Sequence, residues 1–353
     1  MKVLVGLSGG VDSAVTAALL KKRGCRVAGV TMSLWRGGRY RGGEKDACFG
    51  PGEKEDIAAA AEVCRVLDIP HAVIDCSEAY ERLVVEYFRS EYLAGRTPNP
   101  CVRCNGAVKF GLLPRLAKAA GMGFERFATG HYARLIPGPD RMRLHSGKDG
   151  NRDQAYFLHR LGQEQLRTGL MPLGEFDKRR VRDMAREFGL PVHDRPDSQD
   201  FYSGDHRELL KVGAGRGRIV HTSGRCLGWH GGFWNFTVGQ RKGLKISHPT
   251  PLYVVEIDPG RNVVVVGGAD AATSRALTAG DVNWVSIPPP KSEFSAGIKV
   301  RSSGRVVPCR VVPGEGGFRA GFPDGIFGVA PGQSAVLYQG DMVLGGGVIA
   351  SAE

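Results

Sequence analysis

Residues 2–22, KVLVGLSGGVDSAVTAALLKK, indicate the fold class. Residues 2–7 form an apolar run of strand length, and residues 12–22 have the apolar spacing of a helix. Ser8-Gly9-Gly10 separates the two, and glycines allow the sharp turn that such a junction needs. A strand, a glycine-rich turn and a helix in this order predict an α/β domain whose first helix can bind phosphate at its N-terminus.

The same alternation continues beyond this unit. Further strands are predicted at 26–32, 71–75 and 124–129, and helices at 55–67, 79–93 and 107–120. Strands that alternate with helices of this length predict βαβ units and a parallel sheet. After about residue 203 the chain becomes rich in Val, Gly and Pro, and turn residues separate short strands. This second half is predicted to be β-rich, with one or two small barrels and a boundary near residue 270.

Length, composition and charge narrow the class of protein. The chain has 353 residues, of which 42% are hydrophobic and 24% charged, as expected for two or three globular domains. It contains no apolar run long enough for a membrane span, and its first apolar run breaks at Gly9-Gly10, unlike a signal peptide. We therefore expect a cytoplasmic protein. The net charge of +12 favours a polyanionic partner, although a soluble protein can also simply be basic.

The loop from Ser8 to Ser13 carries the strongest functional signal. It contains neither G-x-x-x-x-G-K-[ST] nor G-x-G-x-x-G, which argues against a Walker A loop and a dinucleotide-binding fold. Ser-Gly-Gly-x-Asp-Ser resembles the PP-loop of the ATP pyrophosphatase superfamily, whose members adenylate a carbonyl oxygen and release pyrophosphate. That resemblance implies ATP as a ligand, with Asp12 helping to position Mg²⁺.

The second signal is the pair Cys101 and Cys104 in TPNPCVRCN, residues 97–105. The two prolines predict a stiff, extended loop that presents both thiols. A zinc site is disfavoured because the chain has no second C-x-x-C or H-x₃₋₅-H. Arg96 and Arg103 nearby suggest a lowered thiol pKa, which suits a nucleophile or sulfur carrier, whereas the alternative is two idle surface thiols.

The other cysteines suggest no common site. Five stand singly in apolar runs and are predicted to be small buried hydrophobes: Cys25, Cys64, Cys76, Cys226 and Cys309. Cys48 lies in a polar, glycine-rich loop, and its role is left open.

Six blocks together resemble the tRNA-specific 2-thiouridylases, the MnmA/TrmU family, over essentially the whole chain. They are GLSGGVDS (6–13), AGRTPNPCVRCN (94–105), ATGHYAR (128–134), RDQAYFL (152–158), FTVGQRKGL (236–244) and GQSAVLYQGDMVLGGGVI (332–349). The resemblance implies a PP-loop domain over residues 1–203, a small central β domain over 204–270 and a C-terminal β-barrel over 271–353.

The resemblance also implies roles for single residues. ATP is expected to contact Gly6, Leu7, Ser8, Gly9, Gly10, Val11, Asp12, Ser13, Met32 and Gly130. Cys104 matches the family's nucleophile. Asn99 would face the target base, and the other expected tRNA contacts are His131, Arg152, Asp153, Gln154, Arg301, Ser302 and Gln333. Taken singly, His131 could instead be a core histidine and Arg152 a solvated charge.

The implied reaction is 2-thiolation of the wobble uridine of tRNA. The C2 carbonyl is a poor electrophile, so ATP converts its oxygen into an adenylate leaving group, and a persulfide supplied by a carrier protein then attacks C2. The uridine must leave its stack to reach the pocket, while the basic surface holds tRNA through its phosphates. The oligomeric state and the set of tRNAs are left open.

The chain departs from the family at one position. The family usually carries a second cysteine in an S-x-x-x-C-F block, and its place here falls at Tyr202 within Asp197–Asp205. One hypothesis is that Cys101, where many relatives have Asp, acts as the partner thiol of Cys104. A second is that Cys101, Cys104 and a third thiol such as Cys48 hold an iron–sulfur cluster.

Two other classes of function compete with thiolation. Another PP-loop adenylating ligase, such as an amidotransferase synthetase or argininosuccinate synthase, would explain the loop but not TPNPCVRCN or the basic β-rich half. An altered, non-catalytic tRNA-binding homologue would explain the charge and the missing second cysteine, but it has no use for an intact loop and paired thiols.

Overall fold

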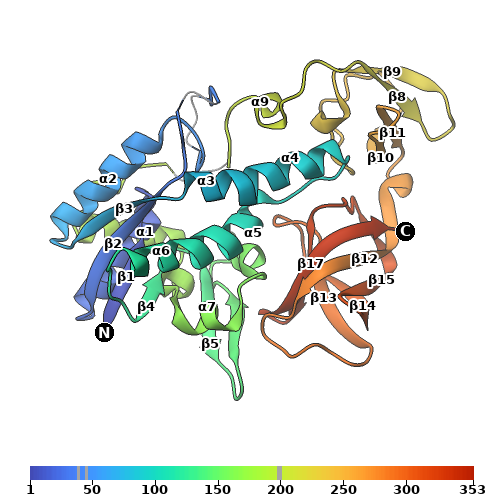
Figure 1. Ribbon diagram of the computed structural model, residues 1–353. Helices are drawn as coiled ribbons and strands as arrows, with labels where there is room; N and C mark the ends of the chain where they lie inside the picture. Colours follow the sequence, from blue (N-terminus) through green and yellow to red (C-terminus); the bar gives the residue numbers. More distant parts are fainter. Residues whose placement is uncertain (38–39, 44–46, 197–200) are drawn as a thin grey trace. The chain divides into compact units, whose positions relative to one another are not determined.

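The computed structural model describes residues 1–37, 40–43, 47–196 and 201–353. The chain forms two compact units (Figure 1), which we describe separately. Unit 1 comprises Met1–Val85, Pro100–Glu208 and Asp341–Val343, and unit 2 comprises Glu86–Asn99, Leu209–Gly340 and Leu344–Glu353. Among the described residues, no helix is long and apolar enough to cross a membrane.

Unit 1 is built on a parallel sheet in the order β3-β2-β1-β4-β7. Its strands are β1 (Lys2–Gly6), β2 (Arg26–Ser33), β3 (His71–Asp75), β4 (Arg126–Ala128) and β7 (Gly169–Leu170). Because β1 pairs with β2 on one side and with β4 on the other, the strand order reverses at β1. In open α/β sheets, ligands bind beyond the carboxyl ends of the strands at such a reversal.

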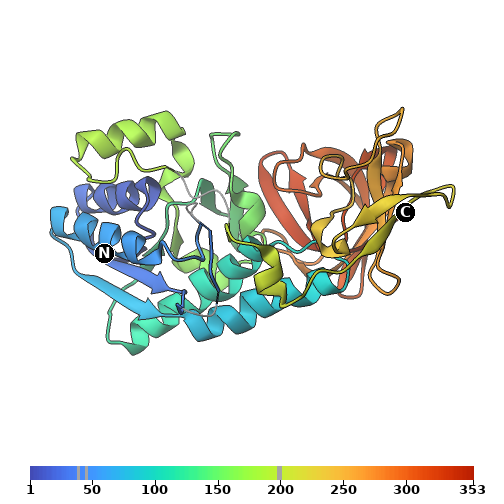
Figure 2. The same cartoon turned by 90° about the horizontal axis from the view of Figure 1, so that it is seen from above.

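Helices cover both faces of this sheet, as Figure 2 shows. One face carries α1 (Val11–Lys22) and α2 (Glu53–Val66), with α8 (Lys178–Glu187) packed on the outer side of α1, and the other face carries α6 (Leu113–Ala119) and the π-helical η2 (Asn105–Leu112). Helix α1 is buried on two sides, since Ala17 and Leu20 pack toward the sheet while Ala14 and Ala18 pack in the cluster with α8. This double burial explains why α1 is apolar almost all round rather than amphipathic.

The rest of unit 1 consists of short elements and a hairpin. The hairpin strands β5 (Ala133–Pro137) and β6 (Met142–Ser146) are antiparallel, and β6 also pairs with Met342 and Val343 of β17. The short helices are α3 (Ser77–Tyr80), η1 (Glu81–Val85), α5 (Pro100–Cys104), η3 (Ala155–Leu158), α7 (Gln163–Thr168) and η4 (Pro172–Glu175).

Unit 2 contains α4 (Glu86–Leu93), a four-stranded sheet and a closed barrel. The sheet has the order β10-β11-β8-β9, with β8 (Gly217–His221), β9 (Cys226–His230), β10 (Tyr253–Asp258) and β11 (Val263–Gly267). The barrel is β12 (Thr273–Asn283), β15 (Gly317–Phe327), β14 (Val307–Gly314), β13 (Phe294–Lys299), β16 (Ser334–Gln339) and β17 (Met342–Ala352), closed by pairing of β12 with β17. Closure leaves these strands no free edge. Helix α9 (His206–Leu210) links the two units in sequence, and η5 (Phe233–Asn235) and η6 (Asp270–Ala272) are single turns.

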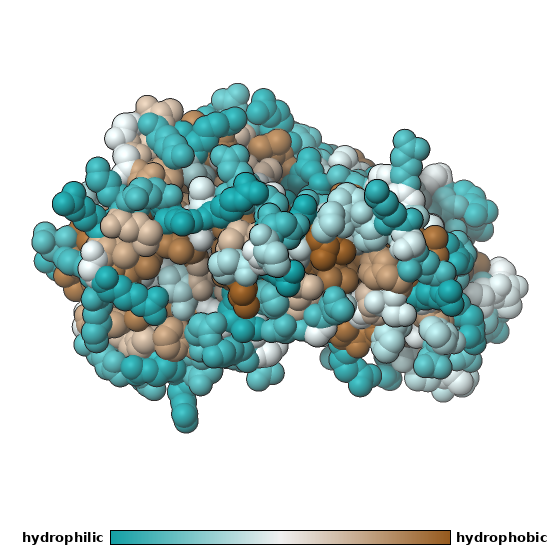
Figure 3. Space-filling model, turned by 90° about the horizontal axis from the view of Figure 1, so that it is seen from below, coloured by the Kyte–Doolittle hydropathy of each residue, from teal (hydrophilic) through white to brown (hydrophobic). Residues whose placement is uncertain are grey.

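Figure 3 shows the hydropathy of one face of the molecule. Hydrophilic side chains cover most of the face shown in Figure 3, and apolar ones show through in separate patches. Large apolar residues that are exposed, such as Val66, Trp229 and Val312, come from different elements. Scattered apolar residues of this kind are ordinary for a globular protein.

The predicted parallel α/β half and β-rich half are confirmed, with two local differences. Cys101 and Cys104 lie in helix α5 and not in an extended loop, because Pro100 occupies the first helical position, where its fixed φ and missing N–H are tolerated. Of the five isolated cysteines, three are buried, but Cys25 is half-buried and Cys226 is exposed. The prediction for Cys226 is wrong because it begins β9, which is an edge strand.

The packing between α1 and α8 leads to a prediction about the free energy of unfolding. Leu190 is fully buried in their shared cluster, so Leu190→Ala leaves a cavity and is expected to lower the free energy of unfolding by about 2–5 kcal/mol. Val66→Ala is the matched control, since Val66 on α2 is 40% exposed. Urea titration followed by circular dichroism checks this, and equal midpoints for the two variants would contradict the packing described here.

Candidate active site

Hydrogen bonds within the loop between β1 and α1 hold its conformation. Gly9 has a positive φ of 76°, and a Cβ there would lie 2.4 Å from the carbonyl oxygen of Asp56, so only glycine fits. The Ser13 hydroxyl donates to the carbonyl oxygen of Gly10 at 3.1 Å and accepts from the backbone N–H of Ser8 at 3.2 Å. The N-cap residue Gly10 has no side chain to cap α1, which leaves the N-terminal amides of the helix suited to an anion.

Gly130, just beyond β4, packs directly against this loop. A Cβ on Gly130 would lie 2.7 Å from the carbonyl carbon of Asp12 and 2.8 Å from the backbone nitrogen of Ser13. The reversal of strand order at β1 brings these two strand ends together. Met32 is half-buried near the end of the neighbouring strand β2. The structure thus gathers the predicted nucleotide contacts at the carboxyl ends of three adjacent strands.

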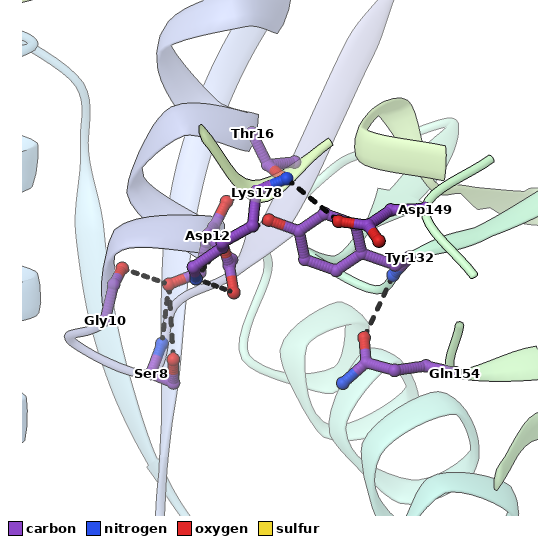
Figure 4. Close-up of polar contacts among 9 residues, drawn as sticks. Ser8, Gly10, Asp12, Thr16, Tyr132, Asp149, Gln154 and Lys178 are labelled. Atoms are coloured by element: carbon purple, nitrogen blue, oxygen red, sulfur yellow. Dashed lines mark hydrogen bonds and ion pairs between the residues drawn. The ribbon is translucent and has the colours of Figure 1, made fainter. Parts of the chain in front are cut away.

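The Asp12 carboxylate has two partners from distant parts of unit 1 (Figure 4). The ammonium group of Lys178 lies 2.7 and 2.8 Å from its two oxygens, and the Tyr132 hydroxyl donates to one of them at 2.8 Å. Lys178 is only 9% exposed and begins α8. Sequence reasoning missed Lys178 and Tyr132 in this role, because a pairing across 166 positions leaves no local pattern.

A second cation holds the loop from another direction. One terminal nitrogen of Arg195 donates to the carbonyl oxygen of Gly9 at 2.9 Å, and the other lies 2.8 Å from the Asp56 carboxylate. The loop is therefore flanked by two cations, each paired with a carboxylate. This arrangement suits a polyphosphate, because cationic side chains bind phosphate strongly. The paired carboxylates balance the charge of these cations while no ligand is bound.

Asp153 and Gln154, predicted to contact tRNA, make bonds within unit 1. The side-chain oxygen of Gln154 accepts from the backbone N–H of Tyr132 at 2.9 Å (Figure 4). Asp153 accepts from the Ser146 hydroxyl and from the backbone N–H groups of Gly147 and Ala155, each at 3.1 Å. These bonds fix the turn that holds Tyr132 in place. Arg152 beside them is exposed.

His131 is buried, with 8% of its surface exposed. Its Nδ1 lies 2.7 Å from the Thr129 hydroxyl, and its ring packs 5.7 Å from that of Phe110. Burial, and to a smaller extent Lys109, hold its pKa well below the usual value, so the imidazole is neutral at neutral pH. These contacts are those of a core histidine, and its contact with tRNA stays a prediction.

Cys101 and Cys104 are half-buried in α5, three residues apart and hence on one side of the helix. Burial raises the pKa of the Cys104 thiol to about 11, Lys109 lowers it in part, and Cys48 and Cys76 add to the increase. The expectation of a lowered pKa is therefore wrong for Cys104. The Nε of Arg103 points to the carbonyl oxygen of Leu83 instead, and Arg96 pairs with Glu91 in unit 2.

Tyr202, at the place of the family's second cysteine, packs beside the segment that carries Cys48. The backbone N–H of Phe49 donates to the carbonyl oxygen of Phe201 at 3.0 Å, and the rings of Phe49 and Tyr202 lie 6.2 Å apart. The Tyr202 hydroxyl donates to Glu208 at 2.7 Å. Residues 197–200 of the same block lie outside the described residues. Cys48, which precedes Phe49 in the chain, is exposed, so an exposed cysteine lies in the segment that packs against Tyr202.

The remaining predicted tRNA contacts belong to unit 2. Arg301 donates to the carbonyl oxygens of Val238 and Gly328, both at 2.6 Å, and Gln333 donates to that of Thr97 at 3.1 Å. Asn99 and Ser302 are half-buried. Within the described parts of the chain, no three His, Cys, Asp or Glu residues are grouped to hold a metal, and the iron–sulfur cluster stays a prediction.

The parallel sheet, its reversal at β1 and the loop from Ser8 to Ser13 define a PP-loop nucleotide-binding domain. Family models match all three parts of the chain: a tRNA methyl transferase HUP domain over residues 1–202, a tRNA methyl transferase PRC-barrel domain over 209–268 and an aminomethyltransferase beta-barrel domain over 274–349. The chain belongs to the tRNA-specific 2-thiouridylase (MnmA) family.

Two relatives of that name illustrate the match. The protein of Endomicrobium trichonymphae is 46% identical over 99% of both chains. The protein of Pelobacter propionicus is 44% identical over 100% of this chain and 98% of its own. A 4-thiouridine synthetase solved with RNA and bound ATP has a TM-score of 0.34 and 18% identity, with 60% of this chain and 45% of that chain covered. Likeness at that level adds nothing to the family assignment.

The close approach of Gly130 gives a prediction. In Gly130→Ala the added methyl group must push the start of α1 away, since overpacking of this kind costs about 1–3 kcal/mol. We expect weaker ATP binding in isothermal titration calorimetry, by roughly tenfold or more on that scale. Gly123→Ala is the matched control, because a Cβ there meets no atom within 4 Å. Equal affinities in the two variants would show that the contact does not shape the site.

The raised pKa of Cys104 gives another prediction. A thiol with a pKa of about 11 is protonated at neutral pH, so its alkylation by iodoacetamide should be slow at pH 7 and accelerate up to about pH 11. Lys109→Met removes a charge that lowers this pKa and should slow the reaction further at pH 8 to 9. Peptide mass spectrometry reports the rate at Cys104 by itself, and a rate already at its plateau by pH 8 would contradict the assignment.

Proposed function

We propose that this protein converts the wobble uridine of tRNA to 2-thiouridine, using ATP and a protein persulfide donor. The observation that carries the proposal is an intact PP-loop in the same unit as the Cys101–Cys104 pair, in a chain that matches 2-thiouridylases over its full length. The excess of 48 basic over 36 acidic residues supports a nucleic acid as substrate.

The residues of the loop fit the triphosphate of ATP. The N-terminal amides of α1 and the Ser8 and Ser13 hydroxyls are the donors, and the glycines allow close approach. ATP supplies the adenylyl group that makes the C2 oxygen a leaving group. Mg²⁺ fits here only in part, because both oxygens of Asp12 are bound to Lys178; the cation would offset phosphate charge once Asp12 is released.

Cys104 is the nucleophile of the proposed reaction. Its terminal persulfide sulfur attacks C2, so that a C–S bond forms while the C–O bond to AMP breaks. A partner thiolate, assigned to Cys101, then attacks the Sγ of Cys104. The S–S bond to the transferred sulfur breaks, its electron pair stays on the thiouridine sulfur, and a Cys101–Cys104 disulfide forms. A dithiol reductant restores both thiols.

The remaining assignments follow the family. We assign tRNA contacts to Asn99, His131, Arg152, Asp153, Gln154, Arg301, Ser302 and Gln333, and domains to 1–203, 204–270 and 271–353. Asp153, Gln154 and His131 also make hydrogen bonds inside unit 1, which support a second role for them in shaping the proposed tRNA site. We place the enzyme in the cytoplasm, where reduced thiols persist.

The test is thiolation of unmodified tRNA by anaerobically prepared protein with ATP, Mg²⁺ and a persulfide donor. Cys104→Ser should abolish 2-thiouridine in nucleoside mass spectrometry, and Cys101→Ser should limit the reaction to less than one turnover. Cys48→Ser is the informative comparison, because Phe49, the next residue in the chain, packs against Tyr202. Loss of turnover in Cys48→Ser with full activity in Cys101→Ser would show that Cys48, and not Cys101, is the partner thiol of Cys104.

The same assay separates the rival functions. A different PP-loop ligase would release pyrophosphate without tRNA, and a non-catalytic tRNA-binding homologue would release none with it. Pyrophosphate release that depends on tRNA, without any thiolated product, would indicate an adenylating enzyme with another nucleophile.

A further inference from the structure

We propose that Gln333 is a positioning residue for the target base, because it fixes Thr97 and, through Thr97, the neighbouring Asn99. The inference rests on the proposed function in one respect, namely that Asn99 faces the target uridine. It gives Gln333 a task inside the protein in addition to its proposed contact with tRNA, and it gives a related task to Thr237.

The backbone of Thr97 is bound by a turn between β15 and β16 of the barrel. Its N–H donates to the carbonyl oxygen of Pro331 at 2.8 Å, and its carbonyl oxygen accepts from the side-chain amide of Gln333 at 3.1 Å. Gly332 has a φ of 91°, and a Cβ there would lie 2.8 Å from the backbone nitrogen of Thr97. Because Thr97 is only 8% exposed, its backbone groups need partners within the protein, and this turn provides them.

The side chain of Thr97 is bound by a second turn, which lies between η5 and β10. The Thr97 hydroxyl donates to the Thr237 hydroxyl at 3.2 Å. Arg301 ties this turn to the barrel, since it donates to the carbonyl oxygens of Val238 and Gly328, both at 2.6 Å. All of these residues belong to unit 2. Thr97 is thus held by partners 140 and 236 positions away in the chain.

The segment from Thr97 to Pro100 is too stiff to absorb a movement of Thr97. Thr97 and Asn99 each precede a proline, which restricts their backbones to extended conformations, and Pro98 itself has a fixed φ and is buried. A displacement of Thr97 is therefore passed on to Asn99. Small errors in the orientation of reacting groups slow the chemical step even where the substrate still binds. The bond from Gln333 to Thr97 is thus expected to affect the rate of thiolation more than the affinity for tRNA.

The experiment measures the rate of thiolation at saturating tRNA and, separately, the Kd for tRNA by filter binding. Gln333→Met keeps the size of the side chain and removes the donor, so the rate should fall roughly 2- to 10-fold, the range of one lost hydrogen bond. Thr237→Val removes the acceptor of the Thr97 hydroxyl and should act in the same direction. Gln339→Met is the matched control, because Gln339 is exposed at the end of β16 in the same barrel. Thermal unfolding followed by circular dichroism identifies any variant that fails to fold.

The double variant Gln333→Met/Thr237→Val tests whether both residues act through Thr97. If they do, their effects on the rate are coupled, and the double variant should lose less than the product of the two single losses. Multiplicative losses would overturn the proposal, as would a loss confined to the Kd for tRNA or a rate for Gln333→Met equal to that of Gln339→Met. Wild-type protein that makes no 2-thiouridine would instead overturn the proposed function itself.

Discussion

The carboxylate of Asp12 is the point on which the candidate site depends. It receives the Lys178 ammonium from α8 and the Tyr132 hydroxyl from the segment between β4 and β5. Three parts of the chain that are far apart in sequence are thereby fixed around the first turn of α1. Tyr132 is held in turn by Gln154, so the turn after β6 also depends on this contact. The Lys178 ammonium is buried and requires such a partner, because removing a charge from water without one is costly.

Close contacts of the backbone also fix the loop from Ser8 to Ser13. Gly9 approaches the backbone of Asp56 in α2, and Gly130 approaches the backbone of Asp12 and Ser13, in each case more closely than a Cβ would allow. Arg195 ties the outer side of the loop to Asp56 at the start of α2. The phosphate-binding loop is therefore held from several sides while its helix amides stay uncapped by any side chain. This arrangement preorganises positive charge for an anion.

The thiols are governed by burial rather than by nearby arginines. Cys104 has a raised pKa because its environment disfavours the thiolate, although Lys109 partly compensates. Tyr202 fills the place of the family's second cysteine with a ring that packs on Phe49 and a hydroxyl bound to Glu208. The tyrosine is well accommodated, and the segment that carries Cys48 lies beside it. A backbone hydrogen bond between Phe49 and Phe201 joins the segment that carries Cys48 to the segment that carries Tyr202.

The features that could be predicted from the sequence are those that depend on local pattern. Strand and helix periodicity predicted the parallel sheet and the β-rich half, and the spacing of Ser8-Gly9-Gly10 and Asp12-Ser13 predicted the phosphate-binding loop. The folded structure was needed to establish the partners of Asp12, the helical setting of Cys101 and Cys104, the exposure of Cys226 and the raised pKa of Cys104. The physical reason is that burial and long-range pairing depend on which elements meet in space, whereas periodicity and turn chemistry depend only on neighbours in the chain.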